Sequence, residues 1–349
     1  MVHQEKYKGG SNRMFLSFFG AIESGLIYAL MALGVFLSFR VLNFPDLTVD
    51  GSFVTGAAVA AVMIVNGSSP LMATVVAIVA GFVAGCFTGL LHTKGKINPL
   101  LSGILMMIAL YSINLRIMGR SNIPLLNEST LFTSITSFWE NLGLSTPFNQ
   151  MLSFIGIQAN PRTWAILFFA LIITLIVKFL TDYFLKTEVG LALRATGDNQ
   201  KMIRSFSANT DILIILGLGI SNAFVAFSGA LIAQHGGFAD AGMGIGMIII
   251  GLASVIIGEA LFGTKTIART TLAVVGGAIV YRIVVSLALR VDFLDTSDMK
   301  LITSVIVIAA LIAPKVIESN RERRRRKRKR IELEQVLASE EGEKKNVAT

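Results

Sequence analysis

The sequence predicts an all-α, polytopic membrane helix bundle of about eight or nine transmembrane helices, because of its composition and its long, unbroken apolar runs. Of its 349 residues, 53% are hydrophobic and 15% are charged, whereas soluble domains carry about 25% charged residues. Apolar runs of about 18 residues or more recur along the chain, which indicates membrane crossings. In lipid, only helices and closed barrels satisfy their backbone hydrogen bonds, and runs without alternation favour helices.

Candidate spans follow one another from near the N-terminus to a basic tail. We place them at about 14–39, 51–66, 71–91, 100–119, 164–185, 212–234, 246–263, 268–288 and 300–315. The spans 51–66 and 246–263 are short and rich in glycine, and a Phe-x-Asp sequence precedes each. Short, glycine-interrupted segments in matching positions of two halves are typical of inverted repeats with broken or re-entrant helices. We expect that architecture here.

Glycine recurs at every fourth residue of the third span, at Gly81, Gly85 and Gly89. In a helix this spacing puts the three glycines on one face and lets a neighbouring backbone approach closely. We therefore expect that face to pack tightly on another helix.

Charge predicts the orientation of the chain. The net charge is +9, and residues 315–349 hold twelve Lys and Arg against seven Glu, around the sequence RERRRRKRKR. Directly after a membrane run, such a cluster favours a cytoplasmic tail, with contact to anionic headgroups as a second role, over nucleic-acid binding. Counting back through the spans puts 186–211 in the cytoplasm and 120–162 outside.

The predicted organisation is an N-terminal arm (1–13), a transmembrane domain (14–315) and a basic cytoplasmic tail (316–349). Nine crossings put Lys6, Lys8 and Arg13 outside, against the preference of basic residues for the cytoplasm. One re-entrant segment instead of a crossing would put them inside. Both arrangements stay open.

The sequence shows no constellation typical of an enzyme. Its three histidines have no metal-ligand spacing with one another or with Cys86, the single cysteine, so we expect no metal site and no internal disulfide. The stretch GEALFGTKT, 258–266, approaches the phosphate-binding loop of ATPases, but Thr264 separates its glycine from its lysine and no strand precedes it. We therefore expect a chain that hydrolyses no ATP and holds no cofactor.

One polar segment, 186–211, lies between two apolar runs and carries seven charges. Asp198 is a strong N-cap residue, and a short helix is predicted to begin directly after it. Three apolar residues at helical spacing share one face of that helix: Met202, Ile203 and Phe206. The pattern fits an interfacial helix or a knob that docks into a cytoplasmic partner, and the small apolar face favours the knob.

Two charged side chains fall within predicted spans, Glu23 in the first and Arg282 in the eighth. Intramembrane charges are costly unless they are paired or face a polar crevice. If the N-terminus is outside, a rise of 1.5 Å per residue puts both residues roughly 12–14 Å deep. A Glu23–Arg282 ion pair is one hypothesis, and separate polar neighbours for each residue are the other.

Polar residues gather where the two short spans begin. Exposed backbone at such breaks offers hydrogen bonds to a zwitterionic solute, so we expect these residues to line a translocation path. Helix caps are the alternative role for Asp46 and Asp240. The candidates are Asp46, Thr48, Asp50 and Ser52 at the first break, Gln234, Asp240 and Met243 at the second, and Asn222 in the sixth span.

Three stretches resemble one family of membrane proteins. They are ALMALGVFLSFRVLNFPDLTVDGSFVTGAAVAA, EVGLALRATGDNQKMIRSFSANTD and GLGISNAFVAFSGALIAQHGGFADAGMGIGMIIIGLASVIIGEALFG, and they cover most of residues 24–263. In order and spacing they resemble ABC-importer permeases of the branched-chain amino acid and ribose type, the amino-acid subgroup most closely. The Arg-rich extension after Lys315 departs from the compact ends of that family and leaves the role of the tail open.

The resemblance implies a permease subunit in the bacterial cytoplasmic membrane, paired with a second copy, by default as a homodimer. Two cytoplasmic ATPase subunits, which bind ATP and Mg²⁺, would drive it. An extracytoplasmic or lipid-anchored binding protein would deliver an amino acid. In that picture the polar segment faces the ATPase through Arg194, Gly197, Asp198, Met202, Ile203 and Arg204.

Two other functions fit parts of the sequence. An ion-coupled secondary transporter shares inverted repeats and broken helices, but needs carboxylates in the middle of a span, whereas Asp46 and Asp240 lie near span ends. A membrane scaffold without transport has no use for polar breaks inside its bundle.

Overall fold

In the computed structural model the chain folds as an all-α membrane helix bundle. The structure describes residues 2–143, 145–147, 163–205 and 209–288, with single positions between 301 and 325. It divides the chain into two units, Met1–Ile302 and Thr303–Thr349, and every element named below belongs to the first. Within the described residues, seven helices are long and apolar enough to cross a membrane, which confirms the predicted fold class.

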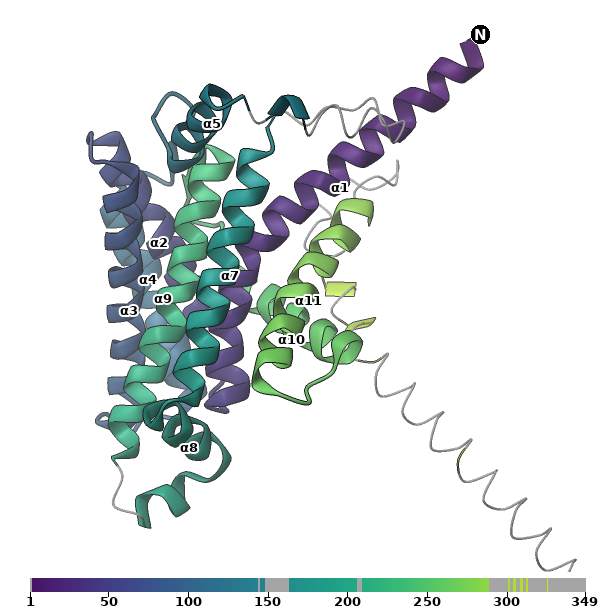
Figure 1. The fold of residues 1–349 in the computed structure, drawn as a ribbon. Coiled ribbons are helices and arrows are strands. Elements are labelled where there is room, and N and C mark those ends of the chain that lie inside the picture. The colour runs from purple at the N-terminus through teal and green to yellow at the C-terminus, as the bar shows by residue number, and fades with distance from the viewer. Residues whose placement is uncertain are drawn as a thin grey trace, which may run out of the picture. The chain divides into compact units, whose positions relative to one another are not determined.

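In Figure 1, α2, α3, α4, α7 and α9 run in roughly the same direction, with α8 at one end of them. In chain order the elements are α1 (Val2–Val35), the π-helical turn η1 (Phe36–Val41), α2 (Thr48–Val65), α3 (Pro70–Thr93), α4 (Pro99–Met118), β1 (Asn122–Pro124), α5 (Leu131–Asn141), α7 (Ala165–Lys186), α8 (Glu188–Ser205), α9 (Thr210–Gly236), β2 (Phe238–Asp240), α10 (Met247–Phe262) and α11 (Ile267–Ala288).

Each of the first eight predicted spans is a helix. The one centred on 246–263 is α10, which has 16 residues and is shorter than the seven long helices. The ninth, 300–315, lies mostly outside the described residues. The predicted N-terminal arm is helical and continuous with α1.

Local sequence fixes where several helices begin and end. Before α3, the side chain of Ser69 accepts a hydrogen bond from the Met72 N–H at 3.4 Å, and a proline follows it at the first helical position. Asn98 begins α4 in the same way. At the other ends, Gly119 after α4 and Gly237 after α9 adopt positive φ angles of 65° and 76°, which glycine tolerates without strain.

The first membrane helix forms the centre of the bundle. In the span Met14–Val41, 89% of the most apolar stretch is buried, against 28% in α4, which therefore lies at the periphery. The main hydrophobic core joins α1 to α7, α9 and α11 through residues such as Leu30, Val177 and Leu218. The last turn of this span widens into the π-helical turn η1, a feature that is frequent at functional sites.

The glycine face predicted on α3 packs against α9. A Cβ atom added at Gly81 would lie 2.6 Å from the Asn222 carbonyl oxygen, and one added at Gly89 would lie 2.7 Å from the Ile215 Cα. Gly85 meets the backbone of Leu218 in the same way. The expected close helix contact is therefore confirmed, and α9 is its partner.

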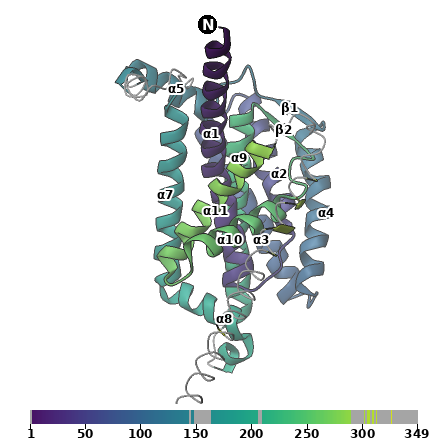
Figure 2. The ribbon, with the colours of Figure 1, turned by 90° about the vertical axis from the view of Figure 1, so that its right-hand side faces the viewer.

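The two ends of the bundle differ. At one end lies α8, and at the other lie α5 and the antiparallel pair β1–β2 (Figure 2). The strands pair Asn122 with Asp240 and Pro124 with Phe238, so they join the end of α4 to the end of α9. After β2 the chain turns through 241–246 and then forms α10, as the predicted broken helix requires.

Candidate functional site

The polar segment forms α8, which is bent at Asn199. There the backbone leaves helical geometry, with φ −155° and ψ 89°, and the Asn199 Oδ1 accepts a hydrogen bond from the Met202 N–H at 3.1 Å. The N-cap is therefore Asn199 and not Asp198, which ends the first part of α8 instead. An amide side chain in extended backbone caps a helix as well as a carboxylate does, so both residues fitted the sequence pattern.

The second part of α8 exposes the apolar residues that the sequence singled out. Met202 is 47% exposed, Ile203 is partly exposed, and Phe206 lies outside the described residues. Arg194 and Asp198 are exposed on the first part of the helix. The surface presented by α8 therefore mixes charged residues with exposed apolar ones, which are Val189 and Leu191 on the first part and Met202 on the second.

The middle of α8 rests directly on the end of the central helix. A Cβ atom on Gly197 would collide with the carbonyl oxygen of Val41 and lie 3.0 Å from the Leu42 Cα. Leu193, one turn earlier, is fully buried in the main core with Leu42. A displacement of α8 therefore acts on the chain immediately after η1.

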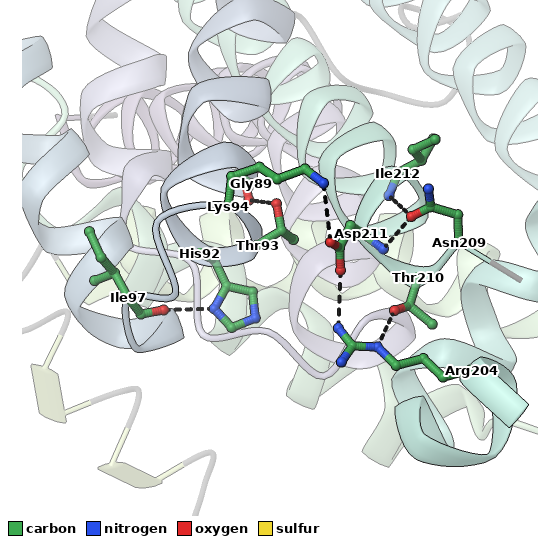
Figure 3. Close-up of polar contacts among 10 residues, drawn as sticks. All are labelled: Gly89, His92, Thr93, Lys94, Ile97, Arg204, Asn209, Thr210, Asp211 and Ile212. Carbon is green, nitrogen blue, oxygen red and sulfur yellow. Dashed lines mark hydrogen bonds and ion pairs between the residues drawn. The ribbon is translucent and has the colours of Figure 1, made fainter.

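The corner between α8 and α9 is held by polar contacts (Figure 3). Asp211 forms ion pairs with Arg204, at 3.0 Å, and with Lys94 of the α3–α4 connection, at 3.6 Å. Arg204 also donates from Nε to the Thr210 hydroxyl at 2.9 Å. Asn209 caps α9 by accepting from the N–H groups of Asp211 and Ile212. The tip of α8 is thus tied to α9 and α3.

Three of the predicted path residues meet at the start of α2. Asp46 is fully buried and accepts hydrogen bonds from the Thr48 N–H at 2.9 Å and from the Asn222 side-chain amide at 2.7 Å. The Thr48 hydroxyl bonds that of Thr88 on α3 at 2.8 Å. Asp46 therefore acts as a helix cap, the alternative role proposed for it, and also ties α2 to α9.

Asp50 joins the first break to the second. Its carboxylate accepts hydrogen bonds from the backbone N–H groups of Gly246, at 2.9 Å, and Ile248, at 2.8 Å. A residue of α2 therefore caps the N-terminus of α10, where the first N–H groups have no partner within the helix. Beside this contact lies a largely apolar pocket of about 590 Å³, which Tyr111 and Asn114 of α4 also line.

The remaining candidates are spread over the bundle. Gln234 donates to the Thr74 hydroxyl at 2.9 Å and accepts from the Leu131 N–H at 3.0 Å, near α5. Asp240 accepts from the Gly242 N–H at 2.8 Å, within the turn after β2. Met243 is partly buried in an apolar cluster, and the buried Ser52 hydroxyl has no hydrogen-bond partner among the described residues.

A sequence profile of the family described as "Branched-chain amino acid transport system / permease component" matches residues 17–312. The chain belongs to this family. It is therefore the permease of an ABC importer for amino acids, a multi-pass membrane protein that works with separate ATPase and substrate-binding partners. Neither the fold nor these matches favour an ion-coupled transporter.

Two relatives cover most of this permease. The tyrosine transport system permease protein of Clostridioides difficile (strain R20291) is 43% identical over 290 residues, which span 83% of this chain and 88% of that protein. An uncharacterized protein of Rickettsia prowazekii (strain Madrid E) is 33% identical over 299 residues, 84% of this chain and 96% of that protein. No solved structure matches the permease.

The hypothesised ion pair between Glu23 and Arg282 does not form among the described residues of the permease. Arg282 instead reaches the hydroxyl of Ser24 at 3.4 Å, and its guanidinium carbon lies 4.7 Å from the centre of the Tyr28 ring. Successive residues of a helix point about 100° apart, so the side of α1 that meets Arg282 carries Ser24 and Tyr28 rather than Glu23.

Sequence reasoning missed one buried ion pair in the permease. Lys178 and Asp182, both on α7, approach to 2.5 Å, and Asp182 also accepts from the Thr271 hydroxyl of α11 at 2.5 Å. Both charged side chains are 8% exposed. The sequence feature that could have revealed this ion pair is the presence of opposite charges at positions i and i+4 inside an apolar run. This contact ties α11 to α7, the helix that directly precedes α8.

Proposed function

We propose that this chain forms the translocation path of an importer for an aromatic amino acid, with tyrosine as the first candidate, and that a separate ATPase moves it through α8. The arrangement of α8 carries the proposal. It is an exposed, capped helix between two membrane helices, and Gly197 seats it on the end of the most buried helix of the bundle. A displacement of α8 by the ATPase would therefore move the central helix of the bundle.

The docking surface is the tip of α8 with its polar neighbours. Met202 and Ile203 supply a small apolar contact, Arg204 follows them directly, and Arg194 and Asp198 are exposed on the first part of the same helix. An apolar centre with a polar rim is the usual anatomy of a protein interface. The ion pair between Arg204 and Asp211 links this tip to the start of α9.

The orientation follows from charge. The end of the bundle with α8 carries Lys94, Lys96 and Lys186, and basic residues near span ends favour the cytoplasmic side. We therefore assign α8 and the basic tail, 316–349, to the cytoplasm, and α5 with β1–β2 to the outside. The path residues then lie between an external binding protein and an internal ATPase, in a homodimer of this chain.

The chain itself supplies no ATP hydrolysis in this proposal. The stretch from Gly258 to Thr266 forms the end of α10 and the loop to α11, so a helix and not a strand comes directly before the loop. A phosphate-binding loop of an ATPase follows a strand. ATP and Mg²⁺ are therefore bound by the partner subunits.

The experiment replaces Met202 and Ile203 by Asp in the full chain, co-expressed with its ATPase. A matched control replaces Leu126 and Leu142, which are 82% and 54% exposed at the opposite end, by Asp. Loss of two interface anchors typically costs about 2 kcal/mol or more, roughly thirtyfold in affinity. We expect the α8 variant to insert normally but to lose co-purification with the ATPase and uptake of labelled tyrosine, and the control to keep both.

Two results would contradict the proposal. Unchanged uptake by the α8 variant would exclude docking at α8. Uptake in the wild type that unlabelled tyrosine fails to compete, while leucine or lysine competes, would exclude an aromatic substrate but leave the coupling surface intact. The two parts of the proposal are thus tested separately.

A further inference from the structure

A second pocket lies beside α8, at the end of the bundle opposite β1–β2, with a volume of about 420 Å³. Its walls come from the end of the first membrane span, the end of α7, the first part of α8, and the loop and first turn that begin α11. The loop contains the Gly-Thr-Lys-Thr sequence, 263–266, for which the transport function gives no role. We call it the Lys265 pocket.

The Lys265 pocket has an excess of positive charge. Arg40, Arg194 and Lys265 line it from three different elements, against the single carboxylate of Asp198. Arg40 is paired with Glu259 of α10, whereas Arg194 and Lys265 form no ion pair within the part of the chain that the structure describes. Two cations from separate elements are therefore available to an anion.

The loop before α11 adds hydrogen-bond donors. Gly263 takes a φ of 77°, and Arg269 holds the loop by donating to the Phe262 carbonyl oxygen at 2.6 Å. The Thr266 hydroxyl accepts from the Arg269 N–H at 3.3 Å, which makes Thr266 the cap of α11. The earlier N–H groups of the first turn have no partner within the helix, and the positive end of a helix favours phosphate groups.

The position of the pocket along the bundle indicates the source of the anion. Its apolar wall residues include Val41, Leu185 and Ile267. The membrane spans end at Val41 and Lys186 and begin at Ile267, so all three lie within one residue of a span end. Phospholipid headgroups lie at this level, and the apolar spans below give a surface for acyl chains.

We propose that the Lys265 pocket binds the phosphate of an anionic phospholipid headgroup. Lys265, Arg194 and the first turn of α11 hold the phosphate, and the acyl chains extend into the bilayer. The site is independent of the proposed substrate. It adds to the proposed coupling, because a phosphate between Arg194 and Lys265 ties α8 to the loop before α11.

The test uses the full chain, purified in detergent without its partners, and native mass spectrometry with added phosphatidylglycerol or zwitterionic phosphatidylcholine. The pocket variant is Arg194→Gln with Lys265→Gln. The control, Lys96→Gln with Lys186→Gln, removes the same charge near the same end but outside the pocket. The basic tail is unchanged in both and contributes equally to background binding.

We expect the wild type to bind phosphatidylglycerol more tightly than phosphatidylcholine. The pocket variant loses about tenfold or more in affinity for phosphatidylglycerol, because each cation near an anionic surface contributes measurably to binding. The control stays within about twofold of the wild type. If the double variant does not purify as a single species, Lys265→Gln alone, on an exposed loop, carries the comparison.

Several results would overturn the proposal. Equal losses in the pocket variant and the control would show that only the overall charge matters. Equal affinity for the two lipids would remove the recognition of an anion. Thermal stabilisation by inorganic phosphate that needs Lys265, with unchanged lipid binding, would make the ligand a soluble anion. Unchanged phosphatidylglycerol binding by the pocket variant would show that the Lys265 pocket is not the lipid site. None of these readouts depends on Met202, Ile203 or uptake.

Discussion

The Asp46 carboxylate accepts a hydrogen bond of 2.7 Å from the Asn222 side-chain amide, although the two residues are 176 positions apart. Both side chains are fully buried. Asp46 lies four residues after Leu42, whose backbone Gly197 of α8 approaches closely. The short connection 42–47 therefore lies between the contact of Gly197 with Val41 and the hydrogen bond of Asp46 to the middle of α9. In the proposed coupling, a displacement of α8 would reach α9 through this connection.

The Asp46–Asn222 contact should contribute strongly to stability. Leaving a buried polar group without its hydrogen-bond partner costs about 1–3 kcal/mol. We expect Asn222→Ala to lower the free energy of unfolding by about 2 kcal/mol, and Asp46→Ala by more, because Asp46 also caps α2. The free energies are measured by SDS-induced unfolding in mixed micelles. Strict additivity in the double variant, with no coupling above about 0.5 kcal/mol, would mean that the two residues do not interact.

The contact of α8 with Val41 and Leu42 should not tolerate a side chain at Gly197. An added methyl group would collide with the Val41 carbonyl oxygen. Overpacking of this kind costs about 1–3 kcal/mol, which lowers the fraction of molecules with α8 packed on Val41 by a factor of roughly 5–150. Gly197→Ala should therefore insert normally but lose most ATP-driven uptake. Gly20→Ala is the control, because no atom lies within 4 Å of a Cβ at that position. Equal uptake by the two variants would show that transport does not require the close contact between Gly197 and Val41.

The buried pair on α7 should be more sensitive to loss of one partner than of both. Lys178→Met leaves the Asp182 carboxylate without its cation, which costs about 3–5 kcal/mol in buried sites. Lys178→Met combined with Asp182→Leu removes both charges and should recover much of the folded yield. Yield and thermal stability in detergent measure this, with Lys186→Met, at an exposed position, as the control. A double variant less stable than Lys178→Met would contradict the prediction.

The membrane helices were predictable because their signal is local. Each of the first eight spans is long or apolar enough to be found by composition, and the lipid leaves the backbone no alternative to a helix. The face of α3 was predictable for a similar reason, since a repeat of four residues fixes Gly81, Gly85 and Gly89 on one side. Neither prediction requires knowledge of the residues that pack against these helices.

The partners of polar side chains were not predictable in the same way. Glu23 and Arg282 were matched by depth alone, but the rotation of α1 brings Ser24 and Tyr28 to Arg282. The helix start in α8 was assigned one residue too early, because Asp198 and Asn199 are both good caps and the fold decides between them. Asp50 was selected as a path residue, and its role in capping α10 appears only when α2 and α10 meet.

The sequence by itself determined the membrane bundle, the short seventh span and the polar segment between the fifth and sixth, because hydropathy and capping act over a few neighbouring residues. Only the tertiary structure decided that this segment rests on Val41, that Asp46 reaches Asn222, and that Arg194 and Lys265 line one pocket. Those contacts depend on helix rotation and tilt. Rotation and tilt are set by packing between residues far apart in the chain.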